Sequence, residues 1–178
     1  MCGVETREDP SIAGAPIEIA VADHGLALRR WRMEDADRLL AAIEASLPEL
    51  RPWMPWANEP ASLDSVRAYL EDGGTETAFG LFEADGEVVG ALGLHDRQGP
   101  GSLEIGYWVR SDRTGRGYAT AAVRALTEIG FACFPDVDRM EIRCHPDNAA
   151  SAAIPPKLGY SLDTGRSGTQ LVWVRFRS

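Results

Sequence analysis

The chain is short of cysteine, of positive charge and of long apolar runs, and each shortage excludes a class of protein. Its three cysteines, Cys2, Cys133 and Cys144, lack the C-x-x-C spacing of a zinc site and cannot all pair, so we expect reduced thiols and no metal. Asp and Glu outnumber Lys and Arg by 27 to 18, which disfavours nucleic acid as a partner. No apolar run is long enough to span a bilayer, so no membrane partner is expected.

The N-terminal stretch lacks the features of a targeting signal. Residues 1–16 carry acids, Gly and Pro without a basic segment followed by an apolar one, which predicts a cytoplasmic protein. Apolar residues make up 44% and charged residues 25% of the 178, as in ordinary globular proteins. We expect a flexible extension over 1–16 and a single domain over 17–178.

Apolar spacing predicts strands that alternate with helices. The expected elements are a hairpin of strands at 17–21 and 26–31, a helix from 35 to Pro48, a rigid aromatic loop at 50–56, a helix capped by Ser62 and stopped by Gly73-Gly74, strands at 78–83, 88–94 and 103–109, a helix through 121–131, a strand at 140–144, a helix at 149–158 kinked by Pro155, and a closing strand pair around 169–176. This order implies an α/β fold with a mixed sheet and helices on its faces.

The segment from Glu104 to Thr120 places a strand, a turn with Gly115 and Gly117, and a helix in succession. Small residues let a ligand approach the backbone, and the first N–H groups of a helix have no internal partner, so a pyrophosphate could bind there. Arg113 and Arg116 would add positive charge. A plain strand-to-helix turn remains the alternative, since a third glycine and a Walker lysine are both missing.

This segment resembles the acetyl-CoA motif of GNAT acetyltransferases, Q/R-x-x-G-x-G/A, with Gly117 and Ala119 in its last two positions and Thr114 departing from its first. Residues 145–160, HPDNAASAAIPPKLGY, resemble the family's second motif, in which N-x-x-S opens a helix that closes with L-G-F/Y. Residues 50–56 and the phrase E-I-G-Y-W are similar to the ribosomal-protein (RimJ/RimL) branch. The likeness spans most of residues 26–176.

The resemblance implies the GNAT fold, a mostly antiparallel sheet splayed between its fourth and fifth strands in the family's count, here those at 103–109 and 140–144. It also implies acetyl-CoA as co-substrate, with the Val109 N–H as a candidate for polarising the thioester carbonyl. The residues expected to bind acetyl-CoA are Tyr107, Trp108, Val109, Arg113, Gly115, Arg116, Gly117, Tyr118, Ala119, Thr120, Asn148 and Ser151.

The acceptor side needs a proton acceptor, because an α-amine is largely protonated at neutral pH. By resemblance Glu104 is the base or the anchor of a water relay, with an ordinary edge carboxylate as the alternative. Ser151 or Tyr160 could give a proton to the leaving thiolate, although Ser151 could equally be a helix-start residue.

The aromatic loop is the candidate wall of the acceptor slot. Trp53, Met54 and Trp56 could line it, with packing against the first helix as the alternative. The expected reaction is acetyl transfer to a primary amine in a ternary complex, with a protein N-terminus as first acceptor and a small cationic amine as second. The alternative is a non-catalytic acyl-CoA-binding sensor or interaction module. Monomer and homodimer both stay open.

Overall fold

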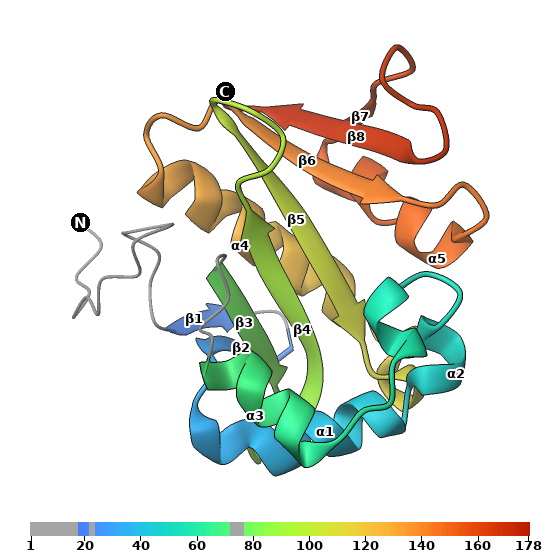
Figure 1. Ribbon diagram of the computed structural model, residues 1–178. Helices are drawn as coiled ribbons and strands as arrows, with labels where there is room; N and C mark the ends of the chain where they lie inside the picture. The colour runs from blue at the N-terminus through green and yellow to red at the C-terminus, as the bar shows by residue number, and fades with distance from the viewer. Residues whose placement is uncertain (1–17, 22–23, 72–76) are drawn as a thin grey trace.

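The computed structural model describes residues 18–21, 24–71 and 77–178, so the expected extension over 1–16 and the Gly73-Gly74 stop lie outside the described residues. The described strands form one eight-stranded mixed sheet in the order β1-β2-β3-β4-β5-β6-β8-β7 (Figure 1). The strands are β1 Glu18–Val21, β2 Leu26–Arg30, β3 Thr77–Phe82, β4 Val88–His95, β5 Ser102–Val109, β6 Arg139–Cys144, β7 Ser161–Leu162 and β8 Leu171–Phe176. Only β5 and β6 pair in parallel, and this confirms the mostly antiparallel sheet.

Helices cover both faces of the sheet (Figure 1). They are α1 Ala36–Glu44, α2 Leu47–Leu50, α3 Leu63–Glu71, α4 Tyr118–Cys133 and α5 Ala149–Ala152, with 3-10 turns η1 Met33–Asp35, η2 Pro55–Asn58, η3 Ser111–Arg113 and η4 Pro155–Leu158. The long helix α4 packs behind β4 and β5, while α1 and α3 pack together on the opposite face. None of the helices in the described part of the chain has the length and apolar character needed to cross a membrane.

Two apolar layers hold these helices to the sheet. The larger lies between α4 and the strands and includes the fully buried Leu28, Phe79 and Leu126. The smaller lies under α1 and α3, where Leu39 and Val66 pack beside Trp108 of β5. Burial of apolar surface at about 25 cal/mol per Å² is the main stabilising contribution in such layers. Apolar side chains therefore pack against both faces of β5, where Tyr107, Trp108 and Val109 lie.

The two predicted hairpins and the strands at 103–109 and 140–144 are confirmed within one or two residues, and the helix predicted through 121–131 is confirmed but begins three residues earlier, at Tyr118. Ser62 caps α3 as expected, because its Oγ accepts a hydrogen bond from the Ser65 N–H at 3.1 Å. The first helix ends earlier than expected, at Glu44, and Pro48 instead lies in the first turn of α2, where no N–H is needed.

The chain after β6 differs from the expected single helix at 149–158. It divides into α5 and η4, because Pro155 and Pro156 cannot donate the hydrogen bonds that would continue α5. The closing strand pair also differs, since β8 pairs with residues 161–162 rather than with a neighbour near Thr169.

Candidate active site

The turn that precedes α4 has the backbone of an anion site. Gly115 and Gly117 have φ of 74° and 83°, a left-handed conformation that favours glycine. Gly117 is the N-cap of α4 and has no side chain to cap it, and the first intrahelical bond runs from the Ala121 N–H to the Gly117 carbonyl at 3.0 Å. The amides of residues 118–120 therefore have no intrahelical partner and are open to an anionic ligand.

Glu83, which follows β3, contacts two side chains of this turn. It was not among the site residues predicted from the sequence. Its Oε1 accepts a hydrogen bond from the Tyr118 hydroxyl at 2.9 Å and lies 3.3 Å from Arg113 Nε. Arg116 is exposed, and Thr114 donates to the Ser111 carbonyl at 2.9 Å. Arg113 and Tyr118 thus shape the turn through Glu83, while Arg116 is open to solvent.

β5 and β6 separate beside this turn. Their ladder covers only Ser102 to Glu104, although β5 continues to Val109. The Arg110 N–H donates to the Val89 carbonyl at 2.8 Å, and N–H directions alternate along a strand, so the amides of Tyr107 and Val109 face the gap left by β6. The Trp108 amide faces β4 and is the less suitable donor.

Across the gap, Tyr107 meets the segment that follows β6. Its hydroxyl lies 2.9 Å from Ser151 Oγ and donates to the Ser151 carbonyl at 3.2 Å. Asn148 caps α5 as expected by accepting from the Ser151 N–H at 3.1 Å. Pro155 has no N–H to donate to the Ser151 carbonyl, which also accepts from the Ile154 N–H at 3.2 Å. Burial raises the pKa of Tyr107 to about 12, partly offset by its hydrogen bond to Ser151, so the phenol keeps its proton at neutral pH.

Tyr160, the second predicted proton donor, lies elsewhere. It is 4% exposed, its hydroxyl lies 2.8 Å from Thr127 Oγ1 of α4, and burial raises its pKa above the ordinary value. Thr127 donates in turn to the Val123 carbonyl at 2.7 Å. This chain of hydrogen bonds satisfies a core tyrosine, and Tyr107 rather than Tyr160 is the phenol beside Ser151.

Glu104 lies on the other face of β5 and is 7% exposed. Its Oε1 is 2.7 Å from Arg97 Nη2, and Oε2 accepts from Arg97 Nε at 3.3 Å and from the Gln98 amide. His95 pairs opposite Glu104 in the sheet, and its ring occupies the space that a side chain at Gly106 would need. Burial, with a smaller effect from Arg97, lowers the pKa of His95 to about 4, so this imidazole is neutral at pH 7.

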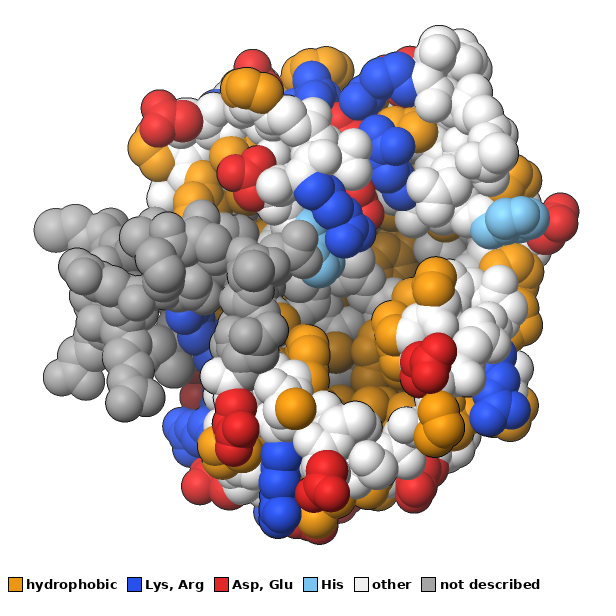
Figure 2. Space-filling model, viewed as in Figure 1, with side chains coloured by type: hydrophobic (Ala, Val, Ile, Leu, Met, Phe, Trp, Pro, Cys, Tyr) orange, Lys and Arg blue, Asp and Glu red, His pale blue; other side chains and the backbone are white. Residues whose placement is uncertain are grey.

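The aromatic segment between α2 and α3 contacts both β5 and the loop that follows β6. The Trp53 and His145 ring centroids are 5.7 Å apart, and the Trp56 and Trp108 centroids are 6.1 Å apart. Both tryptophans remain exposed, at 37% and 43%, while Met54 is half-buried. Figure 2 shows this face hollowed between the α1–α3 side and the β6–β8 side, with hydrophobic side chains in the hollow and Lys and Arg side chains beside it.

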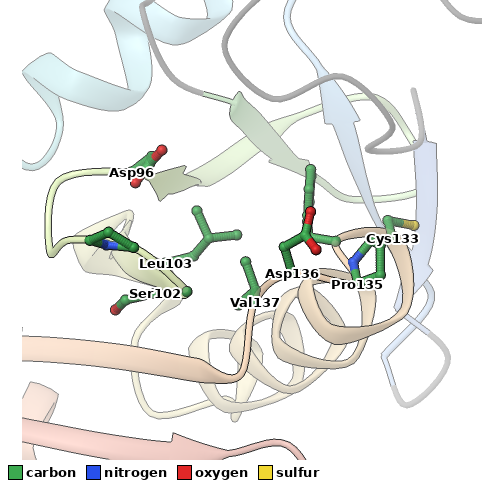
Figure 3. A pocket seen from close by; sticks show the side chains of 10 residues that line it. Asp96, Ser102, Leu103, Cys133, Pro135, Asp136 and Val137 are labelled. Carbon is green, nitrogen blue, oxygen red and sulfur yellow. The ribbon is translucent and has the colours of Figure 1, made fainter.

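A separate cavity of about 330 Å³ lies at the far end of α4, where its C-terminus meets the start of β5 (Figure 3). Asp96, Leu103, Cys133 and Asp136 are among its lining residues, and none of the predicted site residues is. Within the described ranges no group of three or more His, Cys, Asp or Glu side chains could hold a metal ion. We therefore centre the site on the gap between β5 and β6.

Comparison with known proteins agrees with this fold. The family model of the GNAT acetyltransferase domain matches residues 26–161. A Bacillus subtilis protein that carries the name of a ribosomal N-acetyltransferase, YdaF, is 30% identical over 152 residues, which are 80% of each chain.

Two solved structures extend the comparison. The Mycobacterium smegmatis RimJ structure with CoA-disulfide is 26% identical with a TM-score of 0.72, covering 85% of this chain and 81% of that one. The microcin C7 self-immunity acetyltransferase MccE, solved with acetyl-CoA and AMP, has a TM-score of 0.78 at 20% identity, covering 94% and 99%. The predicted likeness to the ribosomal-protein branch is confirmed.

Proposed function

The chain belongs to the GNAT acetyltransferase family, and from this premise we propose that it transfers acetyl from acetyl-CoA to the α-amine of a peptide or protein N-terminus. The names of its relatives, a ribosomal N-acetyltransferase and RimJ, support a protein acceptor over a small amine. The observation that carries the proposal is the open-amide turn at Gly117, placed beside the gap where β5 leaves β6.

The residues present fit the two parts of CoA that the fold would bind. Three amides without intrahelical partners and the exposed Arg116 suit a pyrophosphate, and the free edge of β5 suits the amides of pantetheine. Acetyl-CoA supplies the acetyl group as a thioester, whose carbonyl carbon is open to attack by an amine. Asn148 and Ser151 border the same gap through the contact between Ser151 and Tyr107.

Two backbone amides are suited to polarise the thioester carbonyl. The Val109 and Tyr107 N–H groups both face the gap, and fixed donors aimed at a developing oxyanion lower the barrier without reorganisation. Removal of one such donor in other enzymes costs about 10²-fold to 10³-fold in rate. We assign this task to Val109 first and to Tyr107 second.

Glu104 would accept the amine proton through an intervening water molecule. Both of its oxygens are held by Arg97 and Gln98, so direct protonation would have to break these contacts, whereas the carboxylate can still orient a water molecule. The amine then attacks, a C–N bond forms, the C–S bond breaks, and the amine proton passes to the relay. This assigns Glu104 as the anchor of a relay.

Ser151 would assist the leaving group. Ser151 Oγ would donate toward the departing sulfur, and Tyr107 Oη, which lies 2.9 Å from Ser151 Oγ and keeps its proton at neutral pH, can turn that proton from the Ser151 carbonyl to Ser151 Oγ. Trp53, Met54 and Trp56 would wall the acceptor slot on the opposite side of the gap. The cytoplasmic location stays a prediction from the sequence.

The test is thiol release from acetyl-CoA with a panel of N-terminal peptides and small amines. We expect release only when an amine is present, with higher kcat/KM for peptides. Binding of acetyl-CoA without release for every amine would leave the sensor function instead.

A further inference from the structure

Four arginines surround two buried carboxylates, Glu104 and Glu141, on the face of the sheet that carries Glu104. We call Arg97, Arg139, Arg143 and Arg166 the arginine cluster. Glu141 is fully buried, and its Oε1 accepts from Arg139 Nε and from Arg166 Nη1, each at 2.7 Å. Two guanidinium groups therefore already balance this carboxylate before Arg143 is considered.

Arg143 reaches both carboxylates. Its Nη2 donates to Glu141 Oε2 at 3.1 Å, and its Nε lies 3.8 Å from Glu104 Oε2 without a hydrogen bond of its own. Arg97 binds Glu104 from the other side through Nη2 and Nε. Arg97 and Arg143 thus converge on a single carboxylate oxygen, and over the described residues no contact engages the Nη1 group of either.

The local charge is opposite to that of the whole molecule. The arginine cluster carries four positive charges, and the acids that it contacts are Glu104, Glu141 and Asp163, which leaves an excess of one positive charge. The net charge of -9 is spread over the chain, and salt screens charges that lie more than about 8 Å away. The ion pairs of the arginine cluster therefore leave a local excess of positive charge beside Glu104.

Two members of the arginine cluster, Arg97 and Arg143, are exposed enough to contact a ligand. The Arg97 side chain is 52% exposed and that of Arg143 is 23% exposed, so both can meet a ligand that enters beside Glu104. A guanidinium group binds a carboxylate through two parallel N–H groups. The paired hydrogen bonds fix the orientation of the carboxylate as well as strengthening the contact. A lysine or other cation at the same place would meet two like charges.

We propose that the acceptor is a peptide N-terminus with an acidic side chain within its first three residues, and that Arg97 and Arg143 bind this carboxylate. The inference rests on the proposed function and narrows its substrate class. The arginine cluster beside Glu104 favours an acidic group there, although the net charge of the whole chain is -9.

The test compares three peptides that differ only at positions two and three, which are glutamate, glutamine or lysine, with free glutamate as a fourth acceptor. Steady-state thiol release gives kcat/KM for each in the wild type and in Arg97→Gln, Arg97→Lys and Arg143→Gln. Arg175→Gln is the matched control, because Arg175 forms a comparable ion pair with Glu128, at 2.9 Å, on α4 behind the sheet.

In the wild type we expect the glutamate peptide to exceed the glutamine peptide about tenfold in kcat/KM, and we expect the lysine peptide to be the slowest. The ratio of glutamate to glutamine should fall toward one in Arg97→Gln and Arg143→Gln and with added salt. It should survive in Arg175→Gln and in part in Arg97→Lys.

Equal rates for the three peptides, or a ratio that persists in both glutamine variants, would overturn the inference while the proposed function stands. Faster turnover of free glutamate than of any peptide would overturn the peptide assignment. No acetylation of any acceptor would overturn the proposed function, and this inference with it.

Discussion

The Trp53 ring lies 5.7 Å from the His145 ring, so the segment that follows α2 reaches across the gap between β5 and β6 to the loop after β6. Trp56 of the same segment packs against Trp108 of β5. One short aromatic segment therefore contacts β5 and the loop that follows β6, the two sides of the proposed site. Both tryptophans stay exposed in this arrangement, and we propose that they lie beside the acceptor.

Trp53→Ala and Trp56→Ala should raise KM for the peptide acceptor several-fold and leave KM for acetyl-CoA nearly unchanged, because loss of uniform binding appears in the affected substrate. Steady-state kinetics with each substrate varied in turn measures this. Phe176→Ala is the control, since Phe176 is 62% exposed at the end of β8. A change confined to the acetyl-CoA term would remove the tryptophans from the acceptor slot.

Gly117→Glu should abolish CoA binding. A side chain there would be strained at φ of 83°, would approach His24 Nε2 to 3.2 Å, and would bring negative charge to the phosphate site. Calorimetry with CoA gives the affinity. Gly99→Glu is the control for backbone strain, because Gly99 has φ of 90° with no atom within 4 Å of an added side chain. Unchanged affinity in a folded Gly117→Glu variant would contradict the turn assignment.

Glu104→Gln should lower kcat at neutral pH by roughly 10²-fold, with little effect on CoA affinity. Glutamine keeps the size of the side chain but loses the charge that pairs with Arg97. The rate should recover as pH rises toward and above the pKa of the amine, which then deprotonates without help. A pH–rate profile that matches the wild type would show that Glu104 has no part in proton transfer.

Ser151→Ala should lower kcat more than Tyr107→Phe does, since in our proposal Ser151 donates to the sulfur and Tyr107 acts through Ser151, its neighbour at 2.9 Å. The double variant should cost no more than Ser151→Ala alone, because the two hydroxyl groups form one unit. Because the pKa of Tyr107 is raised to about 12, the phenol stays protonated below that pH, and its loss should not alter the profile between pH 6 and 9. Additive losses of kcat in the double variant would show that Ser151 and Tyr107 act independently.

The order of strands and helices and the glycine turn could be predicted because they depend on neighbouring residues. Glycine adopts a left-handed backbone at little cost, and Gly115 and Gly117 both do so just before α4. The contact between Tyr107 and Ser151 could not be predicted, because the two residues are 44 positions apart and meet only after β5 and β6 separate. The hydrogen-bond partner of Tyr160 could not be predicted for the same reason, since Thr127 lies 33 positions away on α4.

The most direct test of the central claim is mass spectrometry of a peptide that carries both an N-terminal α-amine and a lysine side chain, after incubation with the enzyme and acetyl-CoA. We expect one acetyl group per peptide, located on the α-amine by fragmentation, with one equivalent of CoA released. Acetylation of the lysine instead, or tight binding of acetyl-CoA with no acetylated product, would contradict the account.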